Sequence, residues 1–346
     1  MKLVTFDTNG ARHIGAMLPD GNTIADFTAA SPAPHFRDML SLIDGGAAAL
    51  DEARALVASP KASAALAAVK LLAPVPEPRQ MRDFLCFEMH LRQARANRYL
   101  FGGGERGDPA KMDIPKIWYE QPIYYKCNRF SVIGTGADVI WPLDSKMLDY
   151  ELEFGIILGK GGKNIPKEQA RAHIFGYLIF NDVSARDIQI REMQGQLGPT
   201  KGKDFDTGNI LGPWLVTADE MEPYRDPDGF LALEMSVSVN GIQIGNDLLS
   251  NMGWPFEELV AYAARGAQVR AGDVLGSGTC GNGGCLAELW GRRGGLDPEP
   301  LKPGDVVEMT VQGIGTIRNT VVAGVDLPPV RPARSRSRAR SAAASV

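Results

Sequence analysis

Four acidic residues are the clearest candidates for chemistry in this sequence. Glu151 and Glu153 lie two positions apart in DYELEFGIILGK, so in a strand both side chains project from one face, roughly 7 Å apart. Asp182 ends the apolar run HIFGYLIFND, and Asp83 lies in RDFLCFEMH. Anions in such apolar surroundings are costly unless a cation compensates them. Carboxylates without Cys/His pairs select a hard ion, so we expect a divalent cation, Mg²⁺ first, with Mn²⁺ or Ca²⁺ as the alternatives.

Simpler interpretations exist for each acid. A Glu-x-Glu pair is common on a solvated strand face, and Asp182 stands where it could cap a helix that begins near Ser184. The occurrence of several acids together favours the metal site over these alternatives. The glycine-rich run GSGTCGNGG at 276–284 lacks both the GKS/GKT ending and the GxGxxG spacing, so it is not a phosphate loop.

Composition and charge exclude other classes of function. The chain has 346 residues, 44% hydrophobic and 23% charged, as expected of a globular protein with a sizeable core. Five of the 37 basic residues lie after Val330, which leaves 32 against 41 acids and a net charge of −9 for residues 1–330. An acidic body does not attract nucleic acid or anionic membranes, so neither partner is expected.

The cysteines and the N-terminal residues predict a location. Cys86, Cys127, Cys280 and Cys285 form no CxxC pair, so we expect free thiols in a reducing compartment. The first residues lack the apolar core of a signal peptide, and no run approaches the ~18 apolar residues of a membrane span. We therefore expect a cytoplasmic protein.

The elements that position these residues begin with a small N-terminal domain, residues 1–75. Residues 2–27 alternate apolar runs with the turn signals TNG and PDG, which is typical of short antiparallel strands. Helical spacing follows at 34–46 and 47–59, and the prolines of PVPEPRQ then place a domain boundary near residue 75.

A strand-rich domain is predicted over residues 76–330. Its β-type runs are each closed by Gly, Pro, Asn or Asp, and two helices stand out, SARDIQIREMQ with Ser184 as its cap and PFEELVAYAARG with Gly266 as its stop. Residues 331–346 alternate Arg and Ser without an apolar pattern, so we expect a disordered tail.

Several motifs are similar, in their residues and in their order along the chain, to those of the fumarylacetoacetate hydrolase family. They span about residues 80–325 and are YELE, FNDVSARD, GKDFDT, KPGDVV and GIGTIRN. The resemblance implies an α+β, β-rich chain with a mixed β-sandwich roll beside a small N-terminal α/β domain. It also implies a divalent metal held by carboxylates, action on 2-oxo or β-diketo acids, and a homodimer.

The resemblance assigns roles to the acids and to a histidine. Glu151, Glu153 and Asp182 match the family's metal-binding acids, and Asp83 matches the extra acid of the fumarylacetoacetate hydrolases. In those enzymes this acid precedes a catalytic histidine by seven positions, so His90 resembles the general base.

Four further residues resemble parts of the family's active site. Lys203 matches the lysine that stabilises negative charge on the reacting carbonyl, and Gln189 the glutamine that helps to bind the oxyanion. Thr279 matches the threonine that holds the acid of the substrate. Small family members orient the histidine with a glutamate three residues later, but Gln93 stands there, and we assign that role to Glu288 in GCLAEL instead.

These parts predict a metal-dependent hydrolase that cleaves a C–C bond in a β-diketo or acylpyruvate-type acid such as fumarylacetoacetate. His90, oriented by Glu288, would activate water. The resemblance also implies that the protein has a role in aromatic-compound catabolism. Leu85 stands where those hydrolases have a tyrosine, so the contacts to the acyl group differ. A metal enolate would equally serve a decarboxylase, hydratase or isomerase of a 2-oxo acid, and this alternative stays open.

Two rival functions come from other classes of protein. One is a noncatalytic ligand-binding relative, which the presence of His90 disfavours. The other is RNA binding by the Arg/Ser tail, which the acidic body disfavours. The expected partner is therefore a small-molecule oxo acid.

Overall fold

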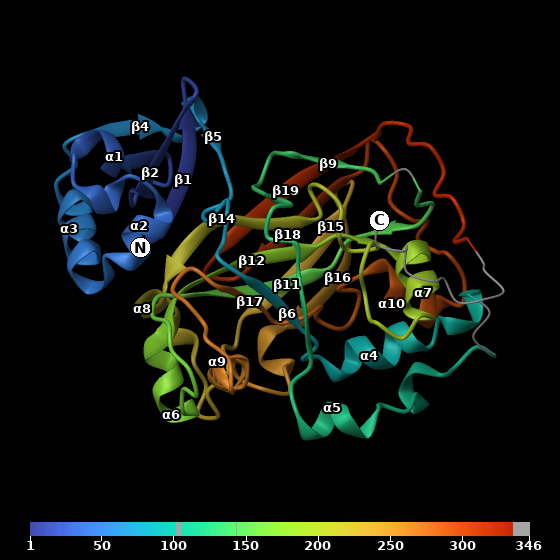
Figure 1. Cartoon of the computed structure of the whole chain (residues 1–346). Coiled ribbons are helices and arrows are strands. Elements are labelled where there is room, and N and C mark those ends of the chain that lie inside the picture. The colour runs from blue at the N-terminus through green and yellow to red at the C-terminus, as the bar shows by residue number, and fades with distance from the viewer. Residues whose placement is uncertain (102–104, 143, 335–346) are drawn as a thin grey trace, which may run out of the picture.

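The fold is described by a computed structural model, which covers residues 1–101, 105–142 and 144–334 (Figure 1). Strands dominate, and a larger and a smaller sheet pack together around the main hydrophobic core. The N-terminal elements, blue in Figure 1, gather at one end of the larger sheet.

Short helices cover the antiparallel strands of the N-terminal residues. β1 (Lys2–Thr8) turns back into β2 (Ala11–Met17) through Asn9 and Gly10, whose φ angles of 54° and 83° suit an Asn-Gly hairpin turn. Buried apolar side chains of the helices pack onto the larger sheet. The other elements here are β3 (Thr23–Asp26), α1 (Phe27–Ala30), α2 (Met39–Asp44), α3 (Gly46–Ala58), β4 (Ser63–Ala65) and β5 (Lys70–Leu71).

The larger sheet carries the functional residues, and its strands run in the order β4-β3-β2-β1-β14-β12-β11-β17-β6-β7. Because β1 pairs with β14, the N-terminal strands continue the sheet of the following residues. Neighbours along this order are antiparallel except β17 and β6, which are parallel. The strands after β1 are β14 (Asn209–Thr217), β12 (Ile174–Asp182), β11 (Leu152–Leu158), β17 (Val274–Gly276), β6 (Met81–Phe84) and β7 (Tyr124–Lys126).

The smaller sheet covers one face of the larger one, with the strand order β16-β15-β18-β19-β9. Apolar side chains of both sheets form one continuous core, which includes Ile156 and Tyr177 from the larger sheet and Met309 from the smaller one. Its strands are β9 (Asp138–Ile140), β15 (Glu234–Val239), β16 (Ile242–Leu248), β18 (Val306–Val311) and β19 (Gly315–Val322).

Two helices meet at the end of the larger sheet far from the N-terminal elements (Figure 1). α4 (Glu88–Arg95) packs closely on α10 (Leu286–Arg293) at Gly291. The contact requires glycine, because a Cβ built there would lie only 2.0 Å from the backbone oxygen of Gln93. The other helices are α5 (Lys116–Glu120), α6 (Lys167–Ala170), α7 (Arg186–Met193), α8 (Ala218–Met221) and α9 (Phe256–Ala264).

The predicted α+β, β-rich organisation is confirmed, with one local correction. Ser184 does not cap α7, because it lies in the short strand β13 (Ser184–Ala185) and its hydroxyl donates to the carbonyl of Asp182 at 3.0 Å. Asp182 does not cap the helix either, since α7 has no side-chain cap. The four cysteines are free thiols.

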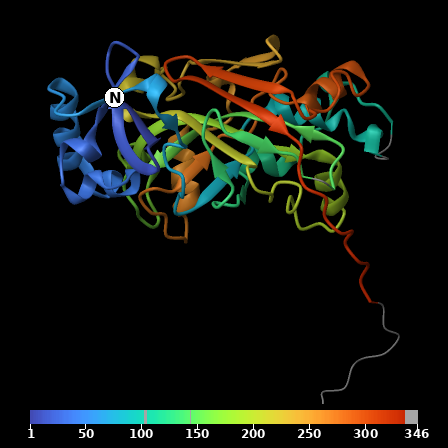
Figure 2. The ribbon, with the colours of Figure 1, turned by 90° about the horizontal axis from the view of Figure 1, so that it is seen from above.

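The C-terminal residues leave the body after β19, and residues 323–334, nearly all of them exposed, run outward (Figure 2). Residues 335–346, which hold most of the Arg/Ser tail, lie outside the described part of the chain. Within the described ranges no helix is long and apolar enough to cross a membrane. The domain boundary near residue 75 stays a prediction.

Candidate active site

Three of the four predicted acids meet in the interior of the larger sheet. Asp83 comes from β6, Glu153 from β11 and Asp182 from the end of β12, and one oxygen of each lies within 4.8 Å of the others. β17 separates β6 from β11 in the sheet, and Gly276 of β17 pairs with Asp83. A Cβ on Gly276 would lie 2.4 Å from Oδ1 of Asp83, so only glycine leaves room for this carboxylate.

The cluster fits a divalent cation by its unpaired oxygens and by its electrostatics. Oε2 of Glu153 and Oδ1 of Asp182 are buried and have no hydrogen-bond partner among the described residues. Burial raises the pKa of Asp83 to about 7, and burial also raises the pKa values of Glu153 and Asp182. Buried acids that repel one another need a positive charge, and an all-carboxylate set suits Mg²⁺, Mn²⁺ or Ca²⁺ rather than zinc.

Glu151, the fourth predicted acid, lies beside the cluster and is bound by two basic side chains. Its Oε1 lies 2.7 Å from Nη2 of Arg186, and its Oε2 lies 2.5 Å from Nζ of Lys203. Burial opposes ionisation, but Lys203 and Arg186 outweigh it and lower the pKa of Glu151 to about 2. Glu151 is therefore a fixed anion whose charge is already compensated.

Lys203 links Glu151 to the cluster. Its buried ammonium also lies 2.5 Å from Oδ2 of Asp182, which in addition accepts a hydrogen bond from the hydroxyl of Tyr125 at 2.6 Å. Burial would lower the pKa of Lys203, but Asp182 and Glu151 outweigh it and raise the pKa. The lysine stays protonated, as a residue that stabilises an oxyanion must.

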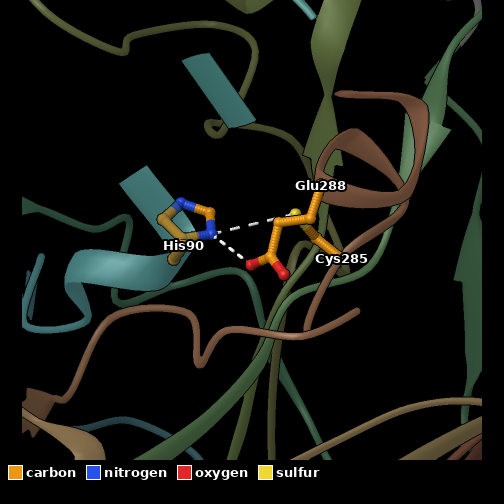
Figure 3. A group of neighbouring side chains, drawn as sticks. All are labelled: His90, Cys285 and Glu288. Carbon is orange, nitrogen blue, oxygen red and sulfur yellow. Dashed lines mark hydrogen bonds and ion pairs between the residues drawn. The ribbon is translucent and has the colours of Figure 1, made fainter. Parts of the chain in front are cut away.

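His90 and Glu288 form a second buried group (Figure 3). Nδ1 of His90, on α4, lies 2.6 Å from Oε1 of Glu288, on α10, and Oε2 of Glu288 accepts from the amide of Gly283 at 2.8 Å. Sγ of Cys285 lies 3.9 Å from the same nitrogen. Burial raises the pKa of Glu288, and its hydrogen bond with His90 opposes this rise.

Gln93 has a different task from the glutamate that small family members carry at this position. Its side chain accepts from the amide of Asn282 at 3.1 Å and donates to the side-chain oxygen of Asn282 at 3.2 Å. It therefore holds α4 against the glycine-rich loop, while the carboxylate of Glu288 holds the imidazole of His90.

The other two predicted residues lie at the edge of the site. The hydroxyl of Thr279 lies 3.3 Å from Oε1 of Glu153, and the side-chain oxygen of Gln189 accepts from Nη1 of Arg186 at 3.1 Å. Tyr125 and Lys203 also line a pocket of about 470 Å³.

Sequence reasoning missed three residues that build the site. Arg186 binds both Glu151 and Asp149, and Asp149 also accepts from the first backbone amides of α10 at 2.7 and 3.0 Å. The only indication of Arg186 in the sequence is its place in the motif FNDVSARD. Tyr125 and Asp149 have no local signal, because their partners lie 57 and 37 residues away.

Glu192 of α7 holds the loop that presents Lys203. Its carboxylate accepts from the amides of Thr200, Lys201 and Gly202 at 2.6, 2.8 and 3.1 Å. The loop lies so close to α7 that a Cβ on Gly202 would be 2.6 Å from the backbone nitrogen of Gln189. The backbone before Lys203 is therefore fixed directly to the helix that carries Arg186.

Comparison with known proteins extends these observations. Residues 80–322 match the model of the fumarylacetoacetate (FAA) hydrolase C-terminal domain. A mitochondrial oxaloacetate tautomerase from Xenopus laevis is 32% identical over 324 residues, which are 93% of this chain and 90% of that protein. The oxaloacetate tautomerase YisK of Bacillus subtilis is 32% identical over 259 residues, 74% of each chain.

A solved structure supports the fold. The fumarylacetoacetate hydrolase from Exiguobacterium antarcticum is 26% identical and superposes with a TM-score of 0.68, covering 93% of this chain and 99% of that one. The roll architecture expected from the motifs is thereby confirmed.

Proposed function

Because the chain belongs to the fumarylacetoacetate hydrolase family, we propose that it interconverts the keto and enol forms of oxaloacetate or a similar 2-oxo diacid. The observation that carries this proposal is the similarity to two oxaloacetate tautomerases, one of which matches nearly the whole chain. The isomerase alternative is thus preferred over the hydrolase.

His90 is the proposed base for this reaction. Tautomerisation breaks the C–H bond at C3, forms an O–H bond at the 2-oxo oxygen and shifts the double bond, with no other reactant. Glu288 occupies Nδ1 of His90, so Nε2 is the nitrogen left to take the proton from C3 and to deliver it to the 2-oxo oxygen, and the reverse transfers convert the enol to the keto acid. The same carboxylate would stabilise the imidazolium that forms.

The remaining residues would bind and polarise the oxo acid. Asp83, Glu153 and Asp182 are the proposed ligands of a divalent cation, Mg²⁺ first, with Glu151 beside them. Such a cation, when bound, would withdraw electrons from the 2-oxo group and make the neighbouring C–H bond more acidic. The ammonium of Lys203 would donate to the enolate oxygen, and Thr279 and Gln189 would hold the polar ends of the substrate.

Hydrolysis of an acylpyruvate-type acid is the second candidate. The observation that favours it is the His90–Glu288 pair, because a base that takes a proton from C3 can equally take one from water. The 26% identical fumarylacetoacetate hydrolase supports the same reading.

The experiment that tests the proposal compares two substrates with one enzyme. Enol oxaloacetate is added to the Mg²⁺-loaded protein, and the loss of its ultraviolet absorbance is compared with a blank that holds the same Mg²⁺. In parallel, an acylpyruvate is added and pyruvate release is measured. We expect acceleration of the first reaction, lost in His90→Ala and kept in the control His35→Ala. Pyruvate release without acceleration of enol loss would instead establish the hydrolase.

Three other expectations stay predictions. They are the homodimer, the cytoplasmic location and the role in aromatic-compound catabolism.

A further inference from the structure

A pocket rich in arginine lies on the larger sheet and includes none of the active-site residues. Its volume is about 410 Å³, and its lining includes Arg79, Arg82, Arg129, Arg270 and Asp273. Residues 1–330 carry a net charge of −9, so four arginines around one pocket do not follow from the overall composition. This concentration needs its own explanation.

Among the described residues, acids neutralise only two of the four guanidinium groups. Arg79 binds Asp44 at 2.7 and 2.5 Å, and Arg82 lies 3.3 Å from Asp273. Within the part of the chain that the structure describes, Arg129 and Arg270 form no ion pair. Arg129 donates to the carbonyl of Pro78 at 2.7 Å, which leaves its charge uncompensated. The pocket therefore carries an excess of about two positive charges.

Arg82 shows in addition a donor without a partner. The residue is 7% exposed, and its buried Nε–H has no hydrogen-bond partner among the described residues. A buried donor without an acceptor costs free energy. Arg82, which lines the pocket, therefore carries a guanidinium group whose hydrogen-bonding capacity the described residues do not use up.

The pocket is separate from the acid cluster. Arg82 directly precedes Asp83 in β6, and successive side chains of a strand point to opposite faces of the sheet. Arg82 therefore does not face the proposed metal ligands, and none of these ligands lines the pocket.

We infer that this pocket binds a small dianion whose oxygen atoms accept hydrogen bonds from the guanidinium groups. Planar guanidinium forks match the oxygen spacing of phosphate and of carboxylate, and two negative charges balance the excess of the pocket. The ligand is a free or esterified phosphate or a dicarboxylate. This inference does not depend on the proposed function.

Isothermal titration calorimetry of the Mg²⁺-loaded protein with inorganic phosphate, and separately with succinate, tests the inference. We expect binding of at least one anion, weakened about tenfold or more in each of Arg129→Gln and Arg270→Gln, because each loses a charge-assisted hydrogen bond. The exposed Arg265, outside this pocket, supplies the control Arg265→Gln, which should bind as the wild type does.

The two anions distinguish the sources of the ligand. Binding of phosphate alone assigns a phosphate or phosphate ester, and binding of succinate alone assigns a dicarboxylate. If neither anion binds, the inference is overturned. Binding that is unchanged in both Arg129→Gln and Arg270→Gln would also overturn it, because the anion would then lie outside this pocket, for instance at the metal site.

Discussion

Oε1 of Glu288 lies 2.6 Å from Nδ1 of His90, although 198 residues separate the two in the chain. α10 and α4 approach closely enough for this contact because Gly291 lies against the backbone of Gln93. A carboxylate on one ring nitrogen fixes the tautomer and leaves the other nitrogen as the base. The geometry is thus that of a hydrogen-bonded pair rather than of two independent residues.

The first prediction concerns this pair. His90→Ala should lower kcat by roughly 10²–10⁴, the usual range for the loss of a positioned base, and Glu288→Gln should slow the same step. If the two act as a unit, the double variant should be scarcely slower than either single variant. Steady-state kinetics on enol oxaloacetate measures all three. Losses that multiply would contradict the pairing, and an unimpaired His90→Ala enzyme would remove His90 from the mechanism.

The second prediction concerns the acid cluster. Glu153→Gln removes the charge of a residue whose Oε2 has no partner among the described residues, so Mn²⁺ affinity measured by calorimetry should fall at least about tenfold and activity should be lost. The exposed Glu77 supplies the matched control Glu77→Gln, which should bind Mn²⁺ normally. EDTA should abolish wild-type activity, and Mg²⁺ or Mn²⁺ should restore it. Full activity in EDTA would refute the metal site.

Local sequence signals predicted much of the fold. The Asn9-Gly10 turn forms a hairpin, and β-type runs within residues 76–330 form strands. Such features depend on residues a few positions apart, which is why pattern and turn chemistry find them. The pairing of β1 with β14 joins residues more than 200 positions apart, and no local pattern encodes it.

The active site likewise combines features that the sequence predicts with contacts that it does not predict. Motifs located the acids, His90 and Lys203 and assigned Glu288 to His90, but they did not show the hydrogen bonds that hold the acids. Tyr125 reaches Asp182 from another strand, and the spacing of Glu151 and Glu153 did not show that Arg186 and Lys203 already bind the first of them. Contacts of this kind follow from tertiary packing and leave no periodic signal.

The third prediction concerns the C-terminal residues. Val330 is 87% exposed, and residues 331–334 are exposed as well, so this segment buries no apolar surface in the body. A chain that ends at Val330 should keep its kcat and its melting temperature. Differential scanning calorimetry and kinetics measure both. A marked loss of either would show that the segment packs on the body or on a partner chain.

The fourth prediction concerns Glu192, whose carboxylate holds the backbone just before Lys203. Glu192→Gln should weaken this clamp, let Lys203 move from its place between Glu151 and Asp182, and lower kcat about tenfold, because small displacements of a charged group are costly in catalysis. KM should change little. The exposed neighbour Arg191 supplies the control Arg191→Gln on the same helix, which should leave kcat unchanged.

The pH dependence of this variant separates a charged clamp from simple packing. Partial burial opposes ionisation of Glu192, but the hydrogen bonds from Thr200, Gly202 and Lys201 outweigh it and lower the pKa below the ordinary value of 4.5. A carboxylate with a lowered pKa stabilises the folded state above its unfolded-state pKa, and this stability is lost as the pH falls through the folded-state pKa. The melting temperature of Glu192→Gln should therefore be about 1–2 °C below that of the wild type at pH 7, and the gap should narrow progressively below pH ~4.5. An equal gap at pH 7 and at pH 3.5 would show that the shape of the side chain, and not its charge, holds the loop.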